Sequence, residues 1–191
     1  MLTENGEHLY VHHEEYQRLI ERLALQIHES GWQFDEILCL ARGGLRVGDV
    51  VIGEAVAHHD VDVTAFGYAI GQVPQLPARF ESAPTLIAVA AEAAAAFEGA
   101  AVHRGLIVSG DQFVHSSDKV AQIRRDFAGV QVVEMEAAAI AQACAQLEVP
   151  FVVVRAVSDL ADEKADVSFE TFLETASVHS AQMVRSIIEA L

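Results

Sequence analysis

The chain has 191 residues, enough for one domain with a substantial hydrophobic core. Twelve Lys and Arg against 28 Asp and Glu give a formal net charge of -16, which argues against nucleic acid or an anionic membrane surface as a partner. Hydrophobic residues make up 52% of the chain and only four residues are Pro, so the composition is not that of a disordered protein.

Three features of the sequence bear on the compartment in which we expect the protein. The first ten residues are polar and acidic and have neither the basic nor the apolar part of a secretory signal. Cys39 and Cys144 both lie in apolar runs, which is typical of reduced, buried thiols and predicts no disulfide. The apolar stretch 86–97 carries Glu92 and is too short to span a membrane. We therefore expect a cytoplasmic protein.

In the first half of the chain, apolar residues at helical spacing predict an amphipathic helix over 16–27 that ends near Ser30 and Gly31. A short apolar run predicts a strand over 36–41, followed by a turn at Arg42-Gly43-Gly44 and a second strand over 47–52. Three of the four prolines lie in 58–84, which predicts irregular chain with at most one short strand.

The second half alternates between helical and strand patterns. Helices are predicted at 85–97, 119–127, 137–147 and 169–191, and strands at 105–109, 130–134 and 151–157. This alternation predicts an α/β fold with a mixed, largely parallel sheet that has helices on both faces. Since the sequence shows neither an internal repeat nor a linker, we expect residues 1–191 to form a single α/β domain.

Polar side chains follow three of the predicted strands, in residues 109–113, 134–136 and 155–159. If those strands run parallel, their carboxyl ends share one edge of the sheet and the three groups converge on one crevice. Carboxylates there suit proton transfer or the binding of hydroxyl groups. Alternatively, the Ser and Asp residues cap the helices that begin after those strands, since both are preferred at that position.

Two pairs of adjacent histidines are candidate metal ligands. The pairs His12-His13 and His58-His59, the latter followed by Asp60, have no third cluster at a ligand-like spacing, so we expect exposed or loop histidines, no metal and no cofactor. Arg42-Gly43-Gly44 is a possible anion-binding loop, but so short a motif carries little weight.

Several longer motifs, in order along the chain, carry a resemblance to a known family. They are VGDVV at 47–51, DVDVTAFGY at 60–68, GLIVSGD at 105–111, VEMEAAAIA at 133–141, PFVVVRAVSD at 150–159 and VSFETFL at 167–173. In these motifs residues 47–191 resemble the methylthioadenosine/S-adenosylhomocysteine nucleosidases, over roughly three quarters of the chain. The resemblance implies a nucleoside phosphorylase-like fold.

It also implies an activity, hydrolysis of the N-glycosidic bond of an adenine thionucleoside to give adenine and a thioribose. By resemblance, Asp159 delivers a proton to the departing purine and Ser158 orients it. Glu136, beside Met135, matches the carboxylate that binds the ribose hydroxyls while positive charge develops on the sugar.

The same resemblance assigns the rest of a pocket. Phe113 matches the aromatic side chain that stacks on adenine, and the backbone of Val114 matches the group that contacts the edge of the base. Arg155 matches the arginine that organises the carboxylates, and Phe169 lines the alkylthio pocket.

A homodimer is implied as well, because Phe66 and Pro74 match positions that the family contributes across a dimer interface. Alternatively, Phe66, Phe113 and Phe169 are simply core aromatic side chains.

The start of the chain departs from that family. Its opening strands and the glutamate that activates water have no counterpart in residues 1–10, and Ala41-Arg42 replaces a Ser-Ala pair. Glu14, Glu54 and Glu134 are candidates to replace that glutamate.

Residues 10–49, with EYQRLIER at 15–22 and ILCLARGGLRVGD at 37–49, resemble instead the start of a purine phosphoribosyltransferase. The acidic loop with which those enzymes bind phosphoribosyl pyrophosphate is absent from this sequence, which argues against transferase activity. The sequence therefore predicts a hybrid of a transferase-like segment, 1–46, and a nucleosidase-like segment, 47–191.

Three functions stay open at this point. They are a nucleosidase with a substituted or missing water activator, an adenine-nucleoside-binding protein without turnover, and a structural hybrid with neither property. A phosphoribosyltransferase ranks last.

Overall fold

The computed structural model describes residues 37–41, 49–95, 101–157 and 182–190. All of them belong to one unit, residues 36–191. The helix expected over 16–27 and the turn at Arg42-Gly43-Gly44 lie outside the described residues, as does most of the segment that resembles a phosphoribosyltransferase. A single domain over the whole chain stays a prediction.

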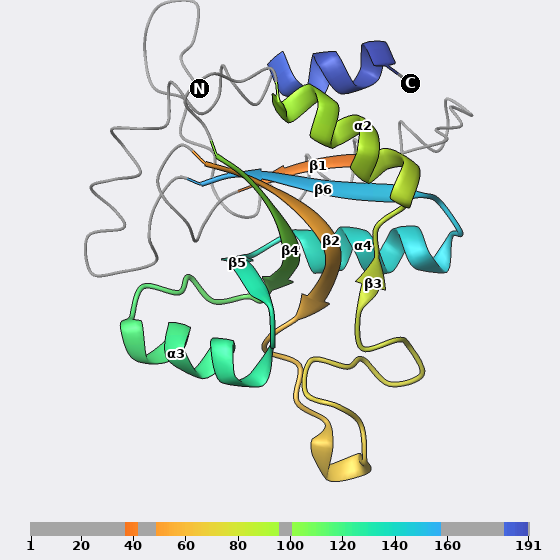
Figure 1. Cartoon of the computed structure of the whole chain (residues 1–191). Helices are drawn as coiled ribbons and strands as arrows, with labels where there is room; N and C mark the ends of the chain where they lie inside the picture. Colours follow the sequence, from red (N-terminus) through yellow and green to blue (C-terminus); the bar gives the residue numbers. More distant parts are fainter. Residues whose placement is uncertain (1–36, 42–48, 96–100, 158–181, 191) are drawn as a thin grey trace, which may run out of the picture. The chain divides into compact units, whose positions relative to one another are not determined.

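A six-stranded mixed sheet forms the centre of the described unit (Figure 1). Its strands are β1 (Ile37–Ala41), β2 (Val50–His58), β3 (Phe80–Glu81), β4 (Val102–Ser109), β5 (Val130–Glu134) and β6 (Phe151–Ala156). They lie in the order β1-β6-β2-β4-β5, and β3 pairs with β2. Strands β2, β4 and β5 are parallel to one another and β1 is parallel to β6, whereas β6 is antiparallel to β2. The prediction of a mixed, largely parallel sheet is confirmed.

The direction of β6 corrects one expectation. Val50 of β2 pairs with Ala156 of β6, so the carboxyl end of β6 lies beside the start of β2. Residues 155–159 therefore do not follow from the same edge of the sheet as residues 109–113 and 134–136. Alternation of strands and helices could not reveal this reversal, because β6 takes its parallel partner from the distant β1, whose pairing no local pattern encodes.

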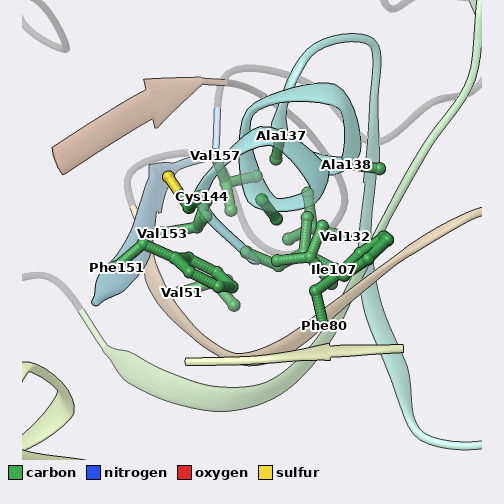
Figure 2. Packing of buried hydrophobic residues seen from close by; sticks show 12 residues of the cluster. Val51, Phe80, Ile107, Val132, Ala137, Ala138, Cys144, Phe151, Val153 and Val157 are labelled. Carbon is green, nitrogen blue, oxygen red and sulfur yellow. The ribbon is translucent and has the colours of Figure 1, made fainter. Parts of the chain in front are cut away.

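Helices pack on both faces, as the sequence predicts. They are α2 (Pro84–Ala95), α3 (Ser117–Asp126), α4 (Ala137–Gln146) and residues 182–190, with a short 3₁₀ turn, η1 (Thr64–Phe66). On β2, Val51 packs with α4, while its neighbours Val50 and Ile52 pack with α2 and residues 182–190. This alternation follows from the period of two along a strand. Figure 2 shows the cluster between α4 and the sheet.

The boundaries of the described elements differ modestly from the predicted ones, and β5 coincides with its predicted range. Of the helix predicted over 169–191, the part 169–181 lies outside the described residues, and 182–190 are helical. The main difference is β2, which continues to His58 rather than ending near Ile52. A bulge at Glu54 interrupts its pairing, between Gly53 and Ala55. This bulge places a charged, exposed residue inside an otherwise buried strand, and so hides the strand's length from a pattern reading. Residues 59–79 are irregular, as expected, and lead into the short strand β3.

None of the helices in the described part of the chain combines the length and apolar character needed to cross a bilayer.

Candidate active site

A buried carboxylate, that of Glu134, lies where β5 leads into α4. Its Oε2 accepts hydrogen bonds from the backbone N–H groups of Glu136 at 2.9 Å and Ala137 at 3.0 Å. Since the first N–H groups of a helix have no partner within the helix, Glu134 satisfies two of them and places its negative charge at the positive end of the helix. The carboxylate is thus fixed by the fold before any ligand binds.

Arg155 of β6 contacts this carboxylate from the other side. Its side chain is fully buried, and Nη2 pairs with Oε2 of Glu134. The same Nη2 lies 3.6 Å from Oε2 of Glu136, whose side chain is 61% exposed. One guanidinium group therefore links a buried carboxylate, which holds it, to an exposed carboxylate, which it can orient.

Ser109, the last residue of β4, completes the buried cluster. Its hydroxyl donates to Oε1 of Glu134 and accepts the backbone N–H of Ala138 at 2.7 Å. Gly110 N–H also donates to the Glu134 carbonyl at 3.1 Å. These bonds join the ends of β4 and β5 to the first turn of α4.

The structure thus brings together members of all three polar groups, Ser109, Glu134 with Glu136, and Arg155. The reason for this proximity differs from the expected one, because Arg155 comes from the reversed strand β6 and not from the edge of the sheet shared by Ser109 and Glu134. The capping alternative is wrong for Ser109, because its hydroxyl accepts an N–H of α4 and not of α3, the helix that follows β4. Glu134, which was not part of that alternative, satisfies N–H groups at the start of α4. Sequence reasoning missed that Glu134 is the central residue of the cluster. The available signal was a carboxylate three residues before the start of a helix.

The residues expected to contact the base and sugar lie on the loops that follow β4 and β5. Phe113 is 56% exposed and stacks against His115, with ring centroids 6.2 Å apart. Val114 is buried, while Met135 is 41% exposed beside Glu136. Phe66 is 81% exposed on η1, and Pro74 is exposed in the same irregular segment. The alternative that Phe66 and Phe113 are core side chains is therefore wrong.

Three expected site residues, Ser158, Asp159 and Phe169, lie outside the described residues. Their roles stay predictions.

Two histidines differ from expectation. His59 is buried, with 6% of its surface exposed, and burial lowers its pKa below the ordinary value. His58 is half-buried, and its Nε2 lies 3.0 Å from Oε1 of Gln142. Both follow from the unexpected length of β2, which carries them into the packed end of the sheet. Within the described ranges, no group of three or more His, Cys, Asp or Glu side chains could hold a metal ion.

Comparison with known proteins places this geometry in a family. A model of the phosphorylase superfamily matches residues 40–189. A methylthioadenosine/S-adenosylhomocysteine nucleosidase of Neisseria meningitidis, solved with methylthio-immucillin-A, is 62% identical with a TM-score of 0.81, covering 88% of this chain and 74% of that one. The chain belongs to the methylthioadenosine/S-adenosylhomocysteine nucleosidase family. Its nucleoside phosphorylase-like fold is thereby confirmed.

Other nucleosidases of this family are similarly related. The structure of the Streptococcus pneumoniae nucleosidase with 8-aminoadenine is 40% identical, with a TM-score of 0.79, and the match covers 91% of this chain and 77% of that one. The curated nucleosidase of Geobacillus kaustophilus is 54% identical over 147 residues, which is 77% of this chain. This chain spans 63% of the length of that relative. The superfamily match begins at residue 40, inside the segment 10–49, and the resemblance of that segment to a phosphoribosyltransferase stays a prediction.

Proposed function

We propose that this chain hydrolyses the N-glycosidic bond of methylthioadenosine or S-adenosylhomocysteine, giving adenine and a thioribose. The observation that carries the proposal is the position of Glu136, an exposed carboxylate 3.6 Å from the buried Arg155. The relatives supply the substrate class, since those solved with ligands hold methylthio-immucillin-A or 8-aminoadenine.

Glu136 would bind the ribose hydroxyls. As the bond to the purine breaks, the sugar acquires oxocarbenium character, and a carboxylate hydrogen-bonded to its hydroxyls stabilises that charge increasingly toward the transition state. Arg155 would keep the Glu136 carboxylate in one orientation, so that little reorganisation is needed when the charge develops. Met135, exposed next to Glu136, would contact the sugar.

Asp159 would act as the general acid that protonates the purine, with Ser158 orienting its carboxyl group. Phe113 is exposed and available to stack on adenine, while the backbone of Val114 would contact the edge of the base. Phe169 would line the pocket for the alkylthio group. No cofactor is needed, because proton transfer and charge stabilisation suffice for this reaction.

The proposed mechanism also needs a group that activates water. Glu134 suits that role poorly, since its oxygens already accept bonds from Ser109, two helix N–H groups and Arg155. Glu54 lies exposed on the bulge of β2, and Glu14 lies outside the described residues. If none of them activates water, we expect turnover about 10²–10⁴-fold below that of an enzyme with a positioned general base.

We propose further that the active form is a homodimer in the cytoplasm. Phe66 is 81% exposed and Pro74 is exposed, and large apolar side chains on such a surface are typical of protein interfaces. The buried thiol of Cys144 is consistent with a reducing compartment. Sedimentation of the purified chain and of a Phe66→Ser variant tests the dimer, because loss of this contact should shift the chain toward monomer.

Release of adenine from methylthioadenosine, followed by chromatography, tests the activity. We expect release by the chain, a rate lowered at least 10²-fold in Asp159→Asn, and a comparable loss in Glu136→Gln. Undiminished release by Asp159→Asn would contradict the assigned acid.

If folded protein releases no adenine but binds it in equilibrium dialysis, the chain is an adenine-nucleoside-binding protein. If it does neither, it is a structural hybrid.

A further inference from the structure

The chain leaves β2 through His59 and Asp60, and both residues contact the start of the loop that follows β4. The backbone N–H of His59 donates to the Ser109 carbonyl at 2.7 Å. The Asp60 carboxylate accepts the backbone N–H of Asp111, with Oδ2 2.7 Å from the nitrogen. A bond of an amide to an ionised carboxylate is stronger than a neutral one, so the course of residues 109–111 is tied to the end of β2.

Gly110, between those two bonded residues, packs directly against the same pair. A Cβ atom added to Gly110 would lie 2.6 Å from Cε1 and Nε2 of His59 and 2.8 Å from Cγ of Asp60. Such approaches are far inside van der Waals contact, so no larger residue fits without moving the loop or the pair. The imidazole and the carboxylate together therefore form a wall against which the backbone lies.

The imidazole of His59 is buried beside Gly110. It is 6% exposed, and neither ring nitrogen has a hydrogen-bond partner within the described part of the chain. Burial without partners costs free energy, which a purely apolar side chain would avoid. Burial lowers the pKa of this ring, and among the charged neighbours Asp60 raises it while Lys119 and His58 lower it.

The far end of that loop is also fixed. Ser116 caps α3 by accepting the backbone N–H of Lys119 at 3.2 Å, and Val114 is buried. Phe113 lies between these anchors, with more than half of its surface exposed. The described contacts thus fix the start and the end of the loop and bury Val114 between them, while the Phe113 ring stays more than half exposed.

We propose that His59 and Asp60 are positioning residues that preform the base-binding loop, residues 110–114, by packing against Gly110 and bonding to Asp111. This inference rests on the proposed function, which assigns Phe113 and Val114 to the purine. The pair would not touch the substrate. It would act by raising the fraction of molecules in which the loop is ready to bind, and apparent affinity scales with that fraction.

The test compares steady-state adenine release from methylthioadenosine by Asp60→Ala and by Asp62→Ala. Asp62 lies two residues further along, and among the residues that the structure describes its carboxylate bonds within its own segment, to the N–H and hydroxyl of Thr64. We expect Asp60→Ala to raise KM about tenfold while kcat changes less than about twofold, since one charge-assisted bond is lost but the bound state is the same. Asp62→Ala should leave both constants unchanged.

Two further variants sharpen the result. Asp60→Asn retains an amide oxygen that can accept the Asp111 N–H, so it should recover most of the wild-type KM. Gly110→Ala should reproduce the raised KM with Asp60 intact. Circular dichroism and melting temperature establish that each variant is folded.

An unchanged KM in both Asp60→Ala and Gly110→Ala, with wild-type activity present, would overturn the positioning role. A fall in kcat alone would overturn it as well. If the wild-type chain releases no adenine, the proposed activity fails, and equilibrium dialysis with adenine then tests the positioning role by the same tenfold criterion.

Discussion

Arg155 and Glu134 form a buried ion pair between strands that do not neighbour each other in the sheet. β6 and β5 are separated by β2 and β4, and β6 runs opposite to β2. The guanidinium group therefore connects β6 directly to β5, two strands of the twisted sheet that do not pair with each other through their backbones. It joins the two sets of parallel strands, and the carboxylate that it contacts also caps α4.

Replacing Arg155 with Met should destabilise the fold strongly. Met fills similar space but leaves the buried Glu134 carboxylate without its counter-charge, and breaking one side of a buried pair costs about 3–5 kcal/mol. Urea unfolding measures the change. Arg185→Met is the matched control, because its ion pair with Glu189 is exposed and contributes at most about 0.5 kcal/mol. Equal midpoints for the two variants would show that the pair contributes nothing.

The N-terminus of α3 offers a second test. The Ser116 hydroxyl accepts the Lys119 N–H, whereas Ser117, the next residue, is exposed inside the first turn. Ser116→Ala should lower the free energy of unfolding by about 1 kcal/mol, the usual cost of losing a helix cap. Ser117→Ala should change it by less than about 0.5 kcal/mol. Chemical denaturation of both variants separates capping from general loss of a hydroxyl.

Gly67 and Gly71 both adopt positive φ, at 84° and 78°, but their surroundings differ. A Cβ at Gly67 would meet nothing within 4 Å, while at Gly71 it would collide with the His58 carbonyl and the Phe127 ring. Gly67→Ala should therefore cost about 1–2 kcal/mol of backbone strain. Gly71→Ala should cost about 1–3 kcal/mol more, because packed atoms must also move. Comparable melting temperatures would contradict this difference.

Burial of His59 predicts a pH dependence of stability. Desolvation lowers the pKa of the folded-state imidazole, so below about pH 6.5 the unfolded chain binds more protons than the folded one. Stability from this group is complete above pH 6.5 and falls as pH decreases toward the lowered pKa. Urea titrations at pH 7.5 and 5.5 should show a smaller loss in His59→Gln than in wild type. His115→Gln controls for loss of an exposed imidazole.

Local pattern was sufficient for most of the sheet. The apolar run of β6, the valine-rich segment of β5 and the apolar spacing of α4 identify these elements closely, because β6 and one side of α4 are buried and β5 is partly buried. The pairing of the strands could not be predicted from local pattern. The bulge at Glu54 depends on β4, whose paired residues lie about fifty positions further along the chain, and the antiparallel contact of β2 with β6 joins residues about a hundred positions apart.

The sequence predicted several residues of the site but not the contacts between them. Strand-end positions pointed to Ser109, Glu136 and Arg155, but the expected shared edge was wrong for Arg155, which comes from the reversed strand β6. The family resemblance supplied the roles of Glu136 and Arg155. The local signal for Glu134 was its place just before α4, but that signal did not mark it as the buried centre, which arises because α4 and Arg155 converge on it. The burial of His59 was missed for a similar reason, because two adjacent histidines after an apolar run give no sign of which one packs inward.

The pairing of β1 with β6 also has a consequence for biosynthesis. Ile37 of β1 pairs with Phe151 of β6, so the first described strand to leave the ribosome finds its neighbour only after the last one has been made. During that interval β1 has an unsatisfied edge and an apolar sequence, ILCLA, a combination that favours contact with other nascent chains. Truncated products ending before residue 151 should therefore depend on chaperones for solubility, whereas the completed chain shields β1 by its own last strand.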